Sequence, residues 1–219
     1  MHAEAHVIGT DISPIQPPDV PPNLQFELED CTSHWTFSPS SFDYIHMRFL
    51  VGSVDDWTAL MERAFKACKP GGYIESFEPS VYIENDDHND HEFTELIRDW
   101  NNLFQGSYTK LGRSFELYEQ DTVRAALQEA GFIDVHETNL KTPIGAWKSG
   151  LELLGAYTRL ALLSDLEGYL IRLADAHGWS LERIMVYASY LRRWFLRKTK
   201  SKVPVYYRQR IVWARKPGQ

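Results

Sequence analysis

The first half of the chain alternates short apolar runs with one clearly amphipathic segment. Four runs have the composition and spacing of β-strands, at residues 6–10, 24–28, 42–47 and 72–77. Between the last two, apolar residues from Trp57 to Cys68 recur on one helical face, which predicts a helix capped by Asp55 or Asp56. Pro70 and Gly71 end this helix. Short apolar strands alternating with helices are typical of a parallel sheet covered on both faces.

After Glu78 the pattern changes to longer helical segments. Residues 85–104 read as a polar loop that enters a helix, and residues 120–132 read as a second helix ended by Gly131. Alternating apolar and polar positions at residues 133–141 then predict a strand with one buried face.

The last third combines helices with a closing strand. Residues 147–198 predict two or three helices, with breaks near Ser164 and at residues 177–180. The segment 203–216 predicts a strand long enough to pair antiparallel with the preceding one. Pro204 near its start indicates that this end lies at an edge of the sheet, because proline donates no ladder hydrogen bond.

Composition indicates an ordinary soluble globular chain. It has 219 residues, of which 43% are hydrophobic and 24% charged. We expect one domain over 1–219, with helical cap segments at about 90–118 and 147–198. No apolar run approaches the ~20 residues that span a bilayer, and the first residues do not read as a signal peptide. Two cysteines, Cys31 and Cys68, favour a reducing compartment, which points to the cytoplasm or nucleus.

Charge is distributed unevenly along the chain. Residues 1–191 carry 13 basic and 30 acidic side chains, whereas the remainder carries no acid. A basic tail can steer nucleic acid or an acidic partner, although no nucleic-acid-binding motif accompanies it. Alternatively it is a solvated helix face and strand that faces the acidic remainder, which the interleaved tyrosines favour. The basic residues are Arg192, Arg193, Arg197, Lys198, Lys200, Lys202, Arg208, Arg210, Arg215 and Lys216.

Polar side chains follow three of the predicted strands. Asp11 follows the first strand, Asp30 and Cys31 follow the second, and the segment 46–48 ends the third. In open parallel sheets, ligands bind beyond the carboxyl ends of the strands. A carboxylate there can accept hydrogen bonds from a ribose diol, and an acid with a small neighbour can accept from an adenine amino group. Taken singly, an acid after a strand is most often a turn former or helix cap.

Other acids and histidines leave further alternatives open. His46 has a resting pKa suited to a general base, but a lone histidine in a strand is also a common core residue. Glu75 and Glu78, at the end of the fourth strand, are alternative bases. The acidic segment 85–92, which contains His88, lacks the ligand spacing of a metal motif, so we expect a solvated loop and no metal site.

Three segments together resemble a known family. They are VIGTDISPIQPPDVPPNLQFELEDC, SFDYIHMRFLVGSVDDW and KPGGYIESFE, and they resemble consecutive core motifs of fungal LaeA-like methyltransferases. That family belongs to the class I methyltransferases, which use S-adenosylmethionine. The resemblance runs from Val7 to Glu78 and continues weakly to the last strand. Members are linked to fungal secondary metabolism or to tailoring of small metabolites.

The resemblance implies a set of site residues. Asp11, with Ile12 beside it, would contact the ribose of S-adenosylmethionine, and Asp30 with Cys31 would contact the adenine. The segment that contains His46 and Met47 would lie beside the methionine and the acceptor. Of these residues, His46 is the candidate catalytic base, and Asp11, Ile12, Asp30, Cys31 and Met47 are the candidate cofactor-binding residues.

The sequence departs from this family at one point. The acid followed by G-x-G, which lets backbone approach the methionyl part of the cofactor, is absent. The implied fold is a Rossmann-like α/β sheet, mostly parallel with an antiparallel last strand and helical cap insertions, that lacks its first strand and glycine loop. That strand would be central, between the strands at 6–10 and 42–47, so these two strands would have unpaired inner edges. Such a chain is a truncated form, is completed by a protein partner or second copy, or has rearranged into a scaffold.

Two functions therefore remain. The first is methyl transfer from S-adenosylmethionine to a small-molecule acceptor, which the strand-end acids favour. The second is a non-catalytic, degenerate methyltransferase that acts as an interaction or regulatory subunit, which the absent glycine loop favours. This pattern predicts neither a nucleic-acid partner nor membrane association.

Overall fold

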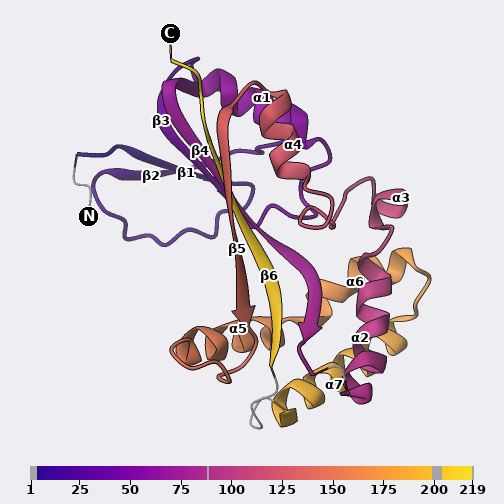
Figure 1. Ribbon diagram of the computed structural model, residues 1–219. Helices are drawn as coiled ribbons and strands as arrows, with labels where there is room; N and C mark the ends of the chain where they lie inside the picture. The colour runs from indigo at the N-terminus through magenta and orange to yellow at the C-terminus, as the bar shows by residue number, and fades with distance from the viewer. Residues whose placement is uncertain (1–3, 88, 199–203, 219) are drawn as a thin grey trace.

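The computed structural model describes residues 4–87, 89–198 and 204–218 (Figure 1). Its strands are β1 (Val7–Asp11), β2 (Leu24–Leu28), β3 (Phe42–Arg48), β4 (Cys68–Asn85), β5 (Ile133–Pro143) and β6 (Val205–Arg215). Its helices are α1 (Trp57–Ala67), α2 (His91–Phe104), α3 (Ser107–Leu111), α4 (Thr122–Glu129), α5 (Glu152–Ser164), α6 (Leu166–Ala176) and α7 (Leu181–Lys198). His88, Lys200 and Lys202, considered above, lie outside the described residues.

The strands form two sheets. A four-stranded sheet has the order β3-β4-β6-β5, in which β3 and β4 are parallel and β6 runs antiparallel to both of its neighbours. A separate two-stranded sheet contains β1 and β2, which are parallel. The predicted α/β fold, mostly parallel with an antiparallel last strand, is confirmed, and so is the pairing of the last strand with the preceding one.

The position of β6 differs from the prediction made from Pro204. β6 is an inner strand between β4 and β5, not an edge strand. The paired residues begin at Val205, opposite Asn85, so Pro204 lies just outside the ladder. Its missing N–H therefore removes no hydrogen bond from the sheet.

The relation of β1 to β3 bears directly on function. Among the described residues, β1 pairs with β2 alone and β3 pairs with β4 alone. In Figure 1 the β1–β2 pair projects sideways from the long four-stranded sheet. Strands must approach to about 4.8 Å to form a ladder, so the two strands expected to flank the central strand belong to separate sheets.

Helices cover the four-stranded sheet at both of its ends. α1 and α4 pack on one face near β3, in a core that includes Leu60, Met61 and Ile74. α2, α6 and α7 form a second core at the other end, around Trp100 and Phe195. The predicted helix breaks are present between α5 and α6 and between α6 and α7.

The second face near β3 is not covered in the same way. Side chains alternate across a strand, and on this face Tyr44 is 53% exposed and Tyr73 is 46% exposed. The neighbouring positions Met47 and Ile74 point to the opposite face and are buried against α1. The expected covering of both faces is therefore wrong for this end of the sheet, where one face is open over the described residues.

Candidate functional site

The first two strand-end acids lie at the same end of the β1–β2 pair. The parallel register places Asp11 opposite Leu28, and the backbone N–H of Glu29 donates to the carbonyl oxygen of Asp11 over 3.1 Å. Asp30 is the next residue. The expectation that both acids stand at neighbouring carboxyl ends of strands is met by this local geometry.

Both acids also form turns. Asp11 Oδ1 accepts from the N–H of Ser13 at 2.8 Å, and no other hydrogen bond in the described part of the chain uses its Oδ2. Asp30 is more fully used, because Oδ1 accepts from the N–H and hydroxyl of Thr32 and Oδ2 accepts from Ser33. The hydrogen bonds from Thr32 lower the pKa of Asp30. Asp11 Oδ2 thus has no hydrogen bond among the described residues, whereas both oxygens of Asp30 are used by its own turn.

Cys31 lies between these acids and the core. It is half-buried, and burial raises the pKa of its thiol, with further contributions from the charges of Asp30 and Asp11. The side chain is therefore a neutral thiol, small and weakly polar, and Trp35 Nε1 donates to its carbonyl oxygen at 2.9 Å. Ile12, on the other side of Asp11, is 73% exposed.

His46 and Met47 point to opposite faces of β3. Met47 is buried in the core under α1. His46 lies on the open face, where its Nδ1 is 3.0 Å from Glu75 Oε1 and its ring stacks on Tyr44 with centroids 6.3 Å apart. Burial and the adjacent Glu75 raise the pKa of Tyr44 to about 12. Because Glu75 accepts at Nδ1, Nε2 of the neutral ring is left as the acceptor nitrogen.

Glu75 and Glu78 have different environments. Glu75 is partly exposed beside His46. Glu78 is only 3% exposed, and its two oxygens accept from the backbone N–H groups of Leu50 and Val51. Burial raises the pKa of Glu78 to about 7, against the opposing effect of these two hydrogen bonds. Glu78 lies four residues after Ile74, so the period of two in a strand places both on the same buried face. That spacing was the sequence signal for the burial of Glu78.

These residues fit a nucleoside better than they fit the methionyl end of S-adenosylmethionine. Asp11 and Cys31 provide an acceptor and a small apolar neighbour at one strand edge. The connection between β1 and β2, residues 12–23, contains five prolines and no glycine. It therefore offers no glycine-rich backbone loop for close approach. His46 and Met47 belong to the other sheet.

Five of the ten basic residues of the last segment have acidic partners from earlier segments in the described part of the chain. The ion pairs join Arg192 to Glu167, Arg197 to Glu92, Arg208 to Glu84, Arg210 to Asp121 and Arg215 to Asp134. These contacts favour the interpretation that the tail faces the acidic remainder of the chain. They also explain why a basic stretch occurs in a chain of net charge −7.

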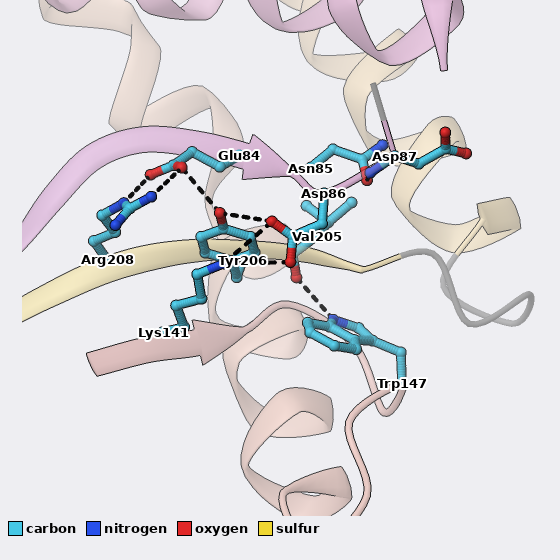
Figure 2. Close-up of polar contacts among 9 residues, drawn as sticks. All are labelled: Glu84, Asn85, Asp86, Asp87, Lys141, Trp147, Val205, Tyr206 and Arg208. Atoms are coloured by element: carbon cyan, nitrogen blue, oxygen red, sulfur yellow. Dashed lines mark hydrogen bonds and ion pairs between the residues drawn. The ribbon is translucent and has the colours of Figure 1, made fainter. Parts of the chain in front are cut away.

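The network around Glu84 and Arg208 was not predicted from the sequence (Figure 2). Arg208 donates to both oxygens of Glu84, at 2.6 and 2.9 Å, and Tyr206 Oη lies 3.0 Å from both Glu84 and Asp86. Lys141 contacts Asp86 at 3.1 Å and lies over the Tyr206 ring. The positive charges of Arg208 and Lys141 balance the negative charges of Glu84 and Asp86. Because these residues come from β5, β6 and the end of β4, the network joins the three strands.

The described residues contain neither a candidate metal site nor a membrane-spanning helix. Within residues 4–87, 89–198 and 204–218, no group of three or more His, Cys, Asp or Glu side chains could hold a metal ion. No helix in the same described part of the chain is long and apolar enough to span a membrane.

Comparison with known proteins identifies the family. Residues 2–137 match the model of a methyltransferase domain. The chain belongs to this methyltransferase family. The LAE1 secondary metabolism regulator of Cochliobolus heterostrophus is 33% identical over 185 residues, which cover 82% of this chain and 59% of that protein. The methyltransferase pytC of Aspergillus terreus is 27% identical over 183 residues, covering 82% and 55%.

Coverage and structure add two facts. The chain spans between 49% and 59% of the length of these and the other LaeA-type relatives it matches. A solved structure from Anabaena variabilis, described as a methyltransferase from an antibiotic biosynthesis pathway, aligns with a TM-score of 0.56 at 11% identity. That alignment covers 94% of this chain and 81% of that one, and it supports the class I methyltransferase fold.

Proposed function

We propose that the protein is an S-adenosylmethionine-dependent methyltransferase of fungal secondary metabolism that acts on a small-molecule acceptor. The observation that carries the proposal is the placement of Asp11, Asp30 and Cys31 at the carboxyl ends of two parallel strands in a methyltransferase-family chain. Asp11 would accept a ribose hydroxyl on Oδ2, and Cys31 would lie against the adenine ring. When bound, S-adenosylmethionine supplies a methyl group on a positively charged sulfur, and the S–C bond electrons remain on sulfur as the methyl group leaves.

The chain's own contribution to transfer would come from the open face of β3. A hydroxyl or amine acceptor loses one proton as its lone pair forms the new bond to carbon, and His46 Nε2 can take that proton. Glu75 would hold the imidazole in the required tautomer through the 3.0 Å contact at Nδ1. Alignment of the acceptor with the sulfur–carbon bond contributes much of the rate in such reactions, so orientation matters more than acid–base strength.

Calorimetric titration with S-adenosylhomocysteine tests this proposal. Measurable binding by the 219-residue chain is expected, and Asp11→Asn should weaken it by on the order of tenfold, because a charge-assisted hydrogen bond is lost. Asp19→Asn, an acid-to-amide change in the loop between β1 and β2, is the matched control. Binding that is absent, or unchanged by Asp11→Asn, contradicts the assignment.

A second function is favoured by one observation, the separation of β1 from β3. In this second function the chain is a non-catalytic subunit. A strand from a protein partner or from a second copy pairs with the unpaired edges of its strands. Light scattering at several concentrations distinguishes the second copy, because self-association raises the mean mass with concentration. A monomer at all concentrations that binds S-adenosylhomocysteine would contradict this alternative.

A further inference from the structure

The turn that follows β3 has a closely specified backbone. It runs from Phe49 to Ser53, and the N–H of Ser53 donates to the carbonyl oxygen of Leu50 at 2.9 Å. Gly52 has a φ of +72°, and a Cβ atom there would lie 2.2 Å from the Phe115 ring. Only glycine satisfies both conditions, so the turn has little freedom to change shape.

Phe49 begins this turn in an unusual conformation. Its φ is +56°, in the left-handed region that non-glycine residues adopt only when their surroundings impose it. Its N–H donates to the carbonyl oxygen of Phe77 at 3.1 Å, and its ring contacts the Phe77 ring edge-on with centroids 5.9 Å apart. The ring is 50% exposed. A strained residue therefore presents an aromatic surface at the carboxyl end of β3.

Glu78 supplies the contact that holds the turn from β4. Its Oε1 accepts from the N–H of Leu50 at 3.1 Å, and its Oε2 accepts from the N–H of Val51 at 2.9 Å. Two successive backbone N–H groups that converge on one carboxylate form an anion-binding arrangement. Because each oxygen takes one donor, the contact determines the direction of the turn as well as its distance from β4.

We propose that Glu78 is a positioning residue, which holds the turn 49–53 and thereby presents Phe49 to the acceptor. The acceptor part of this inference rests on the proposed methyltransferase function. The hydrogen bonds between Glu78 and the turn do not depend on that function, because they involve only the chain's own backbone.

No basic side chain near Glu78 forms an ion pair with its carboxylate among the described residues. The small cavity beside it, about 10 Å³, is also lined by Tyr118, Asp121 and Arg210. Arg210 is engaged elsewhere, since it donates to Asp121 at 2.7 Å and its guanidinium lies 4.3 Å from the centre of the Tyr118 ring. Glu119, on the same connecting segment, hydrogen-bonds to Ser80.

Opening of the turn should therefore depend on pH. Burial raises the pKa of Glu78 to about 7, whereas a Glu exposed by opening returns to about 4.5. The closed turn thus binds the proton more tightly than the open turn, and opening becomes more favourable as pH rises between these two values. If opening exposes Glu78 completely, linkage between these two values sets an upper limit of about 70-fold on the increase in the opening constant from pH 5 to pH 8.

Amide hydrogen exchange of the whole 219-residue chain, followed by NMR from pH 5 to pH 8, tests the proposal. Protection factors of Leu50 and Val51 should fall from pH 5 to pH 8 in the wild type, by at most this ratio, and stay level in Glu78→Gln. The Phe49 ring signals should shift with a midpoint at about 7 in the wild type but not in Glu78→Gln. Glu116→Gln is the matched control and should keep the wild-type profile, because Glu116 binds Tyr82 and not the turn.

Each outcome decides the proposal. Level protection of Leu50 and Val51 in the wild type overturns it, and so does a pH profile that survives Glu78→Gln. If Glu78→Gln does not fold, the wild-type profile together with Glu116→Gln still decides, since both proteins must then show the fall. A failed titration with S-adenosylhomocysteine would overturn the proposed function and leave this exchange result standing.

Discussion

Replacing Glu84 by Gln tests the network that joins β4 to β5 and β6 (Figure 2). The substitution keeps the shape of the side chain but removes the charge that accepts from Arg208 at 2.6 and 2.9 Å and contacts Tyr206 at 3.0 Å. Hydrogen bonds to charged groups contribute about 1.5–3 kcal/mol when buried, and exposed ion pairs contribute about 0.2–1 kcal/mol. The Glu84 side chain is 33% exposed and that of Arg208 is 40% exposed.

Because these side chains are partly exposed, Glu84→Gln should lower the free energy of unfolding at pH 7 by an amount between the two ranges, about 1.5 kcal/mol. For a chain of this size that corresponds to about 3–6 °C in Tm. Urea unfolding followed by tryptophan fluorescence measures it directly. Glu95→Gln, the same change at an exposed position of α2, is the control and should lower stability by less than about 0.5 kcal/mol.

The pH dependence provides the sharper test. Burial alone raises the pKa of Glu84, but the hydrogen bonds from Arg208 and Tyr206 outweigh it and hold that pKa below 4.5. A carboxyl group with a depressed pKa contributes stability that is fully present above its unfolded-state value and is lost as pH falls through its folded-state value. The difference between wild type and Glu84→Gln should thus be constant from pH 6 to 8 and shrink below about pH 4.5. A difference that persists in acid, or equals that of Glu95→Gln, would refute the reasoning.

Three further substitutions probe single contacts, each by urea unfolding. Asp56→Ala removes the side chain that accepts from the N–H of Ala59 at 2.9 Å and caps α1, and it should cost about 1 kcal/mol; no loss would mean that another group caps the helix. Gly155→Ala places a Cβ atom 2.0 Å from the Gly145 carbonyl oxygen and should cost about 3 kcal/mol or prevent folding, whereas a neutral result would contradict the packing of α5. Ser76→Ala removes a buried hydroxyl with no partner among the described residues and should be neutral or stabilise by about 1 kcal/mol, unless bound water satisfies it.

Elements defined by local periodicity could be predicted from the sequence. The apolar spacing of 57–68 predicted α1 to within one residue, because a helix buries residues that are three and four apart whatever it packs against. The helix breaks around Ser164 and residues 177–180 were predicted for the same reason, since helix-terminating sequences act locally.

Features that depend on distant pairing could not be predicted in this way. β4 runs from Cys68 to Asn85, much longer than the predicted strand at 72–77, because β6 pairs with it on both sides of the irregularity between Pro79 and Ile83. A proline in that position reads as a strand end in sequence. The irregularity accommodates it in the structure, because the ladder is already interrupted there.

Site prediction shows the same division. That Asp11 and Asp30 follow strands could be predicted, because strand ends are local features. The use of Asp30 by Thr32 and Ser33 could not, since turn formation and ligand binding draw on the same residue types. The opposite orientations of His46 and Met47 follow from the period of two in a strand, which is a stronger rule than the resemblance that grouped them.

The division between two sheets has a thermodynamic consequence for both proposed functions. The nucleoside side of the proposed site is carried by β1 and β2, and the acceptor side is carried by β3 and β4. A two-stranded parallel pair is only marginally stable by itself, so a strand added between β1 and β3 would order both sides at once. Cofactor and strand would then bind the same ordered state, and each would raise the affinity for the other by the same factor. Under this linkage, the isolated chain should bind the cofactor weakly, and the chain with a strand-donating partner should bind it more tightly. The ratio of the two affinities measures the coupling between cofactor and strand. The two proposed functions therefore differ in whether S-adenosylhomocysteine binds: a methyltransferase binds it, more tightly with the partner present, whereas a non-catalytic subunit binds the partner alone.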